Sequence, residues 1–423
     1  SRWDAGKHKE ALEVFRQLIQ EHPKSPFVAD AYLAFGEYHF ENKKIDNALA
    51  AYKKAAAFEE SKVYGYAVYK QGWCYYNQTE WENAADKFKE VILYSMLDTD
   101  KLGDKKIMLT KEARKDYVTV YSHFGDAAKA PEDFKALADG DDFRAMVERL
   151  ANLYYSEGQD REAAVVYRLM INMDKENTRN PFFQGRIVSC ASRQGNKRVV
   201  VKHARILVEE FQRVREIAGK IDAKDPKKNR VEQDLRDAED LSDNTLRSLA
   251  TTWHNEARKT RDEETYELAY ELYGDYLDLF PDKKPAYDIR FFYAELNYKL
   301  EKFEKAAEQY AKVLDMDPKG KWAESSAEES VRAYDELVND FDKKQKKSAE
   351  SKQDVDPPKP QPIPEIKQKL IVSCENYLKY FEKGKVNIEA NYKIARIHYD
   401  YNHFDKAIEG FNKVIAMAPE HPR

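Results

Sequence analysis

One sixteen-residue pattern recurs along this chain and limits the folds open to it. It reads HKEALEVFRQLIQEHP at 8–23, FEKAAEQYAKVLDMDP at 303–318 and FDKAIEGFNKVIAMAP at 404–419. In each copy an anchor Ala is followed by an aromatic residue four positions later, an aliphatic residue three after that and a Pro five further on. Less complete copies start at Ala48, Ala84, Ala163 and Ala269, and weaker ones span 130–137 and 200–207.

The spacing of the copies predicts the architecture. Ala11 and Ala48 are 37 residues apart, Ala48 and Ala84 are 36 apart, and Ala269 and Ala306 are again 37 apart. A period between about 20 and 50 residues is typical of a solenoid, in which a repeat buries its apolar face against its neighbours.

A second small residue indicates what one repeat contains. It stands twelve residues before the anchor, at Gly36, Gly72, Ala151, Ala257, Ala294 and Ala395. Small residues in two helical stretches predict two antiparallel helices that approach closely, with the aromatic residue filling the space between adjacent units and the Pro ending the second helix. The predicted fold class is all-α, a right-handed α-solenoid of about 8–10 helical hairpins.

These positions resemble the tetratricopeptide repeat family, whose motif has small residues at the two places, then an aromatic residue and a closing Pro. Trp253, sixteen residues before Ala269, matches the leading Trp of that motif. The resemblance covers nearly the whole chain, although the period is longer than the family's usual length of about 34 residues. It implies a non-catalytic protein that binds protein or peptide partners on a concave surface.

A narrower resemblance concerns the joints between repeats. The stretches EHPKSPFVADAYLAFGEYHF and DMDPKGKWAESSA place a Pro and a short polar gap before an Ala-rich helix. They resemble outer-membrane assembly lipoproteins and the Tol–Pal coordinator of bacterial envelopes. VERLANLYYSEGQDREAAVVYRLMI is similar to large periplasmic repeat proteins of myxobacteria, some of which serve gliding motility. The resemblance implies a periplasmic or outer-membrane-associated location and a lipid anchor outside these residues; a cytoplasmic location is the alternative.

The charge and the cysteine content limit the kinds of partner and site that we expect. Lys plus Arg number 71 against 76 for Asp plus Glu, so the net charge is −5 and no basic block stands out. Nucleic acid is therefore a poor partner. No apolar run approaches the roughly 20 residues of a membrane-spanning helix. Cys74, Cys190 and Cys374 are too widely spaced to suggest a disulfide framework or metal site.

Three stretches interrupt the pattern and suggest domain boundaries. A loop is expected at 97–106, two long charged helices broken near Pro226 are expected between 199 and 247, and a Lys/Pro-rich stretch at 342–364 is expected to be disordered. The predicted parts are N-terminal repeats at 1–96, regular and degenerate repeats at 97–215, a charged helical connector at 216–244, repeats at 245–341, the insertion at 342–364 and C-terminal repeats at 365–423.

No catalytic motif is visible. The chain has no Gly-rich phosphate loop, no His-Glu-x-x-His and no nucleophile elbow, so we expect neither an enzyme nor a cofactor. His39 and His398 share one repeat position, nine before their anchors, which favours a structural role over metal binding.

Candidate binding residues are those at inner positions that vary between repeats, because a residue required by the fold should recur. By this criterion Leu33, Glu37, Tyr66, Tyr69 and Trp73 form the predicted partner-binding patch, with packing against the next repeat as the alternative. Weaker candidates are Phe291, Tyr392 and Arg396.

The leading functional hypothesis is a scaffold in a bacterial envelope machine for motility or outer-membrane assembly. A cytosolic peptide-binding regulator and an accessory subunit of a larger enzyme are the alternatives.

Overall fold

The computed structural model describes residues 8–97, 103–348, 359–382 and 384–419. These residues form 19 α-helices and no β-strand, which confirms the all-α repeat fold. The chain divides into two compact units, Ser1–Ala238 and Glu239–Arg423, and the boundary falls within one helix, α12 (Lys228–Thr260). We describe each unit by itself; the predicted domain boundaries stay predictions.

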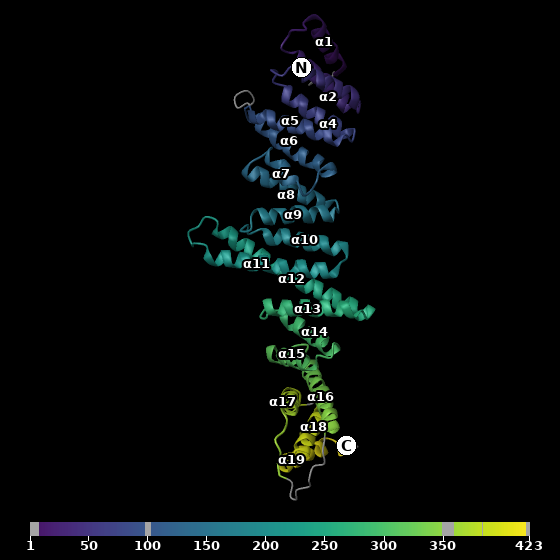
Figure 1. Ribbon diagram of the computed structural model, residues 1–423, viewed down its shortest axis with the longest axis vertical. Helices are drawn as coiled ribbons and strands as arrows, with labels where there is room; N and C mark the ends of the chain where they lie inside the picture. Colours follow the sequence, from purple (N-terminus) through teal and green to yellow (C-terminus); the bar gives the residue numbers. More distant parts are fainter. Residues whose placement is uncertain (1–7, 98–102, 349–358, 383, 420–423) are drawn as a thin grey trace. The chain divides into compact units, whose positions relative to one another are not determined.

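The N-terminal unit consists of helices connected by short turns, drawn from purple to teal in Figure 1. They are α1 (His8–Glu21), α2 (Val28–Glu41), α3 (Ile45–Ala55), α4 (Tyr64–Asn77), α5 (Trp81–Leu97), α6 (Gly103–Phe124), α7 (Ala130–Lys135), α8 (Gly140–Ser156), α9 (Asp160–Met173), α10 (Asn180–Gln194), α11 (Lys197–Lys220) and the start of α12.

The C-terminal unit continues the alternation after the remainder of α12. Its helices are α13 (Glu263–Leu279), α14 (Ala286–Lys299), α15 (Phe303–Met316), α16 (Ala323–Ser348), α17 (Glu365–Tyr380), α18 (Asn387–Asp400) and α19 (Phe404–Met417). Helices α13, α15 and α19 each end two residues before Pro281, Pro318 and Pro419, respectively, as expected for a residue that cannot continue a helix.

Packing runs mainly between successive helices in each unit. In the N-terminal unit α2 packs on α3, α3 on α4, α4 on α5 and α5 on α6; in the C-terminal unit the same order holds from α13 to α19. The first helices of the N-terminal pairs also contact one another, α2 with α4, α4 with α6 and α6 with α8. We call the side that α2, α4, α6, α8 and α10 share the first-helix face.

The recurring small residues explain this packing. Ala48, Ala84, Ala163, Ala269 and Ala306 have no solvent exposure. A Cβ placed on Gly36 would lie 2.3 Å from the Tyr52 ring, and one on Gly72 would lie 2.8 Å from the Phe88 ring. The aromatic residue thus packs on the small residue of its own pair, as well as towards the next unit, where we expected it.

The turn inside a pair is also repeated. Five residues before the anchor, the backbone has positive φ at Lys43, Thr79, Gly158, Glu301 and Asn402. Only one of these five residues is Gly, so the turn is imposed by the pairing of the helices rather than by local preference.

Two of the stretches that interrupt the repeat pattern, 97–106 and 342–364, differ in part from what the sequence predicts. Helix α5 continues to Leu97 and α6 begins at Gly103, so much of the loop expected at 97–106 is helical or lies outside the described residues. Residues 342–348 belong to α16, where the Asp342 carboxylate lies 2.8 Å from the Lys367 ammonium group. At the other end of the predicted insertion, 359–364 has no regular secondary structure, and Gln361 N–H donates to the carbonyl oxygen of Tyr401 at 2.9 Å. These contacts order both ends; residues 349–358 lie outside the described part.

Candidate protein-interaction surface

Leu33 and Glu37 lie on α2 at the start of the first-helix face. Leu33 packs partly buried against the small core formed by Ala48, Tyr52 and Cys74. Glu37 Oε1 accepts a hydrogen bond from the Tyr52 hydroxyl at 2.7 Å and lies 3.3 Å from the Lys70 ammonium nitrogen. Burial and then this hydrogen bond raise the pKa of Tyr52 above its ordinary value. Both predicted binding residues therefore have packing roles.

Tyr66 and Lys70 lie one turn apart on α4 and extend this surface. The Tyr66 side chain is 40% exposed and stacks on Tyr69, with 6.3 Å between ring centroids. The Lys70 ammonium nitrogen lies 4.4 Å from the centre of the Phe40 ring and 5.8 Å from that of Tyr66. Tyr66 is thus the most accessible aromatic residue of the predicted patch.

Tyr69 and Trp73, also on α4, contact other helices. The Tyr69 hydroxyl donates to Asp116 Oδ2 on α6 at 2.6 Å, and burial raises the pKa of Asp116 although this hydrogen bond lowers it. The Trp73 ring meets Phe88 edge-on at 6.0 Å and is partly buried against the main core. For Tyr69 the alternative of packing against the next unit describes the observed contact, whereas Trp73 packs on Phe88 of its own repeat.

The three weaker candidates lie apart from one another. Phe291 is only 7% exposed and stacks on Trp322 at 4.2 Å, so it is a core residue and its prediction as a surface contact is wrong. Tyr392 is half-buried, with its ring 6.0 Å from that of Phe411. Arg396 makes an ion pair with Asp400 at 3.0 Å in the same helix.

A second part of the first-helix face, on α8 and α10, was not predicted as a site. The Arg186 guanidinium carbon lies 4.4 Å from the centre of the Tyr155 ring and 4.9 Å from that of Phe182. Burial favours a higher pKa for Tyr155, but hydrogen bonding by Arg186, Ser189 and Arg193 lowers it overall, as expected beside positive charge. Arg149 on α8 donates to the Lys115 carbonyl oxygen and the Thr119 hydroxyl of α6, both at 3.3 Å.

The sequence contains a signal that could have identified Arg149 and Arg186 as candidate binding residues. Neither Arg149 nor Arg186 has an acidic residue three or four positions away, which is where a helical arginine finds its ion-pair partner. The contact of Arg186 with Tyr155 depends on the packing of α10 beside α8, which the sequence pattern does not reveal.

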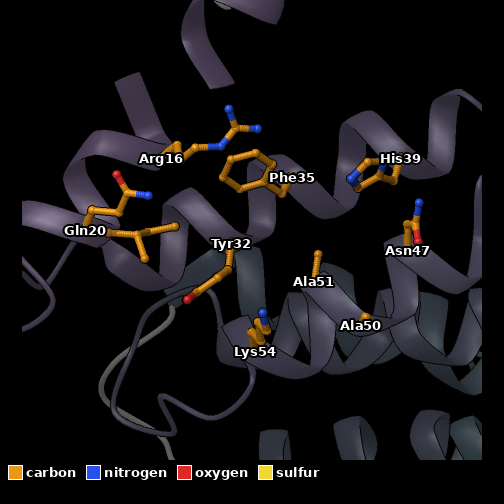
Figure 2. A pocket seen from close by; sticks show the side chains of 10 residues that line it. Arg16, Gln20, Tyr32, Phe35, His39, Asn47, Ala50, Ala51 and Lys54 are labelled. Atoms are coloured by element: carbon orange, nitrogen blue, oxygen red, sulfur yellow. The ribbon is translucent and has the colours of Figure 1, made fainter. Parts of the chain in front are cut away.

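A hollow of about 490 Å³ lies between α1, α2 and α3. Figure 2 shows Arg16 and Gln20 of α1 across from Ala50, Ala51 and Lys54 of α3, with Phe35 and His39 of α2 between them. Arg16 is paired with Glu13 at 2.7 Å, and burial, aided by Lys44, lowers the pKa of His39. The hollow is open and holds no arrangement of groups that indicates chemistry.

The cysteines and acidic residues indicate no reactive centre. Cys74, Cys190 and Cys374 are buried thiols, and burial raises the pKa of Cys74 to about 12 and that of Cys190 to about 11. Among the described residues no three His, Cys, Asp or Glu side chains are grouped to hold a metal ion. In the same part of the chain no helix is both long and apolar enough to cross a bilayer.

Family models described as tetratricopeptide repeat match this chain at 1–62 and 256–321, at 66–94 and at 388–421. These segments are similar to tetratricopeptide repeats. The matched segments contain the anchor alanines Ala11, Ala48, Ala84, Ala269, Ala306 and Ala407. Tetratricopeptide repeats bind protein partners, which agrees with the general class of function predicted for the chain. A search of curated proteins finds no match.

Three solved structures match this chain with low identity and low TM-scores. A chain in a Naa15/Naa10 structure bound to HypK-THB is 13% identical, with a TM-score of 0.30, and the match covers 99% of this chain but 62% of that one. The P58(IPK) tetratricopeptide domain is 16% identical at a TM-score of 0.24, covering 97% and 96% of the two chains. A chain of the APC/C Cut9–Hcn1 hetero-tetramer is 10% identical at 0.23, covering 100% and 92%. At these scores the function must be inferred from the chain's own surface.

Proposed function

We propose that this chain is a non-catalytic scaffold that holds other proteins on its first-helix face within a multiprotein machine of a bacterial cell envelope, for motility or outer-membrane assembly. The similarity to tetratricopeptide repeats supports the scaffold role. The envelope setting, periplasmic or associated with the outer membrane, is supported by the joints between repeats, EHPKSPFVADAY and DMDPKGKWAESSA.

The exposure of Tyr66 is the observation that carries the scaffold proposal. Glu37, Tyr69 and Trp73 are engaged by Tyr52, Asp116 and Phe88, so the fold itself accounts for them. Tyr66 packs against neither of the two core clusters in this region, yet it presents a large ring to solvent. A half-exposed aromatic residue beside an ammonium group, that of Lys70, is typical of a protein-binding contact.

Site-specific photocrosslinking tests the proposal. A benzophenone-bearing phenylalanine replaces Tyr66 in one variant and Phe58 in the control, because Phe58 is similarly exposed, at 38%, but lies in the α3–α4 connection. In the native organism we expect discrete adducts with envelope proteins from position 66 and none from position 58. Equal labelling from both positions would contradict binding at this face. Adducts only with cytosolic proteins would replace the envelope setting with the cytosolic alternative.

A further inference from the structure

We propose that the first-helix face of α8 and α10 binds an acidic protein segment, with Arg149 and Arg186 contacting its carboxylates and Tyr155 and Phe182 contacting its apolar side chains. This inference rests on the proposed scaffold function and names the chemistry of one partner. It concerns a different part of the face from Tyr66, so the two proposals can fail separately.

The charges on this surface are unbalanced. Two of its arginines are neutralised: Arg179 donates to both Glu148 oxygens at 3.0 and 2.7 Å, and Arg193 donates to Asp160 Oδ1 at 2.8 Å. In the described part of the chain no ion pair is formed by Arg149 or Arg186, although the charge of Arg149 acts to lower the pKa of Asp116 on α6, whose carboxylate accepts from the Tyr69 hydroxyl. The Glu148 carboxylate is paired with Arg179, so it does not neutralise the charge of Arg149 or Arg186. Arg186 is therefore the least compensated positive charge of this surface, and Arg149 is compensated only by the more distant Asp116.

Neighbouring rings fix the position of the Arg186 side chain before a ligand binds. Its guanidinium group lies over the rings of Tyr155 and Phe182, and the side chain is half-buried while Phe182 is 39% exposed. Stacking fixes the plane of a guanidinium group, and the bond to Tyr155 uses only part of the five N–H donors of Arg186, so others can bind a carboxylate. Less side-chain entropy is then lost when the ligand binds.

Arg149 borders a hollow that supplies further donors. The hollow has a volume of about 500 Å³ and is lined on α8 by Ala145, Glu148, Arg149, Asn152, Leu153 and Ser156. Asn152 Oδ1 accepts from the Tyr167 hydroxyl at 2.7 Å, so its amide group has N–H donors for a ligand. Hydrogen bonds to α6 hold Arg149 at the rim of this hollow.

The number of available charges favours a peptide over nucleic acid. Nucleic-acid affinity depends on neutralising many phosphates, whereas this surface offers only two arginines without an ion pair, on a chain of net charge −5. A few Asp or Glu side chains alternating with apolar residues match two guanidinium groups, one of which lies beside the exposed Phe182 ring and the half-buried Tyr155 ring.

Peptide display with the full chain tests this inference. A random peptide library is panned against the chain and against Arg149→Glu and Arg186→Glu variants, with Arg161→Glu as a control because Arg161 is exposed and lies on α9. We expect the enriched peptides to be acidic. Their affinity for Arg149→Glu and for Arg186→Glu should be lower by a factor of about ten or more, and their affinity for Arg161→Glu should equal that for the native chain. Their affinity should also fall as salt concentration rises.

A conservative variant separates a contact from a fold defect. Arg186→Lys keeps the charge but loses the planar stack, so we expect intermediate binding and an unchanged far-ultraviolet circular dichroism spectrum. Enrichment of neutral or basic peptides, no enrichment, acidic binding insensitive to both Glu variants, or tighter binding of a single-stranded oligonucleotide would each overturn the inference. None of these results bears on crosslinking from position 66, which tests the scaffold itself.

Discussion

The Tyr52 hydroxyl donates a hydrogen bond to Glu37 Oε1 at 2.7 Å, and the same pair of positions is bonded in two other repeats. Tyr167 donates to Asn152 Oδ1 and Tyr310 to Glu295 Oε1, both at 2.7 Å. Where the aromatic residue is Phe88 or Phe411, the corresponding position holds Trp73 or Arg396, which are not carbonyl or carboxylate acceptors. The residue eleven before the anchor is thus an acceptor in three of the four repeats that have a Tyr here; in the fourth it is Arg258, and the Tyr273 hydroxyl lies 3.2 Å from His254 Nδ1 instead.

Replacing Tyr52 with Phe should lower the free energy of unfolding by about 1–2 kcal/mol, because it leaves a partly buried carboxylate without its donor. Urea unfolding followed by circular dichroism measures the change. Glu37→Gln keeps an acceptor and should cost less. An unchanged midpoint for Tyr52→Phe would show that the hydrogen bond contributes nothing net.

The contact between Gly36 and Tyr52 makes a steric prediction. Gly36→Ala should destabilise the chain by about 1–3 kcal/mol, since its new methyl group would start 2.3 Å from a fully buried ring. Gly219→Ala in α11 is the matched control: nothing lies within 4 Å of its Cβ, so it should be neutral or stabilise the helix by up to about 1 kcal/mol. Thermal melts of both variants measure the difference in stability. Equal effects of the two substitutions would contradict close packing at Gly36.

The repeated turn predicts opposite effects for opposite substitutions. Glu301 has φ of 56° and Gly158 has φ of 75° at the same repeat position. Glu301→Gly should raise the unfolding free energy by about 0.5–1 kcal/mol, and Gly158→Ala should lower it by about 1 kcal/mol. Denaturant titration of the pair tests this, and destabilisation by Glu301→Gly would show that the glutamate side chain matters more than the backbone strain.

His254 predicts a pH dependence of the C-terminal unit. Burial, aided by Arg258, lowers the pKa of His254 to about 4, and the residue is 8% exposed with Nδ1 3.2 Å from the Tyr273 hydroxyl. Between the unfolded pKa of about 6.5 and the folded value only the unfolded chain binds the proton, so stability falls as pH falls through this range.

The full effect is up to about 3 kcal/mol. His254→Gln should flatten the curve of melting temperature against pH between 6.5 and 4 relative to the native chain. Parallel curves would mean that His254 titrates normally in the folded state. The comparison is between variants because burial also lowers the pKa of His398 in the same unit.

The fold could be predicted from sequence because its determinants recur: buried anchor alanines, the aromatic residue four positions later and the closing Pro appear in repeat after repeat. The candidate site could be predicted only in part. Glu37 and Trp73 vary between repeats because they match a neighbouring aromatic residue, so variability did not separate packing from binding. Arg186 acquires its environment from Tyr155 on another helix, a pairing that periodicity does not reveal.

Because each helix packs mainly on the next one, the hairpins of a unit need not open together. Amide hydrogen exchange should then be graded, slowest for hairpins covered on both sides and faster towards the helices with a single neighbour. Such a chain can lose or change one hairpin during evolution while those further along keep their structure, which lets a new partner be accommodated without redesigning the remainder.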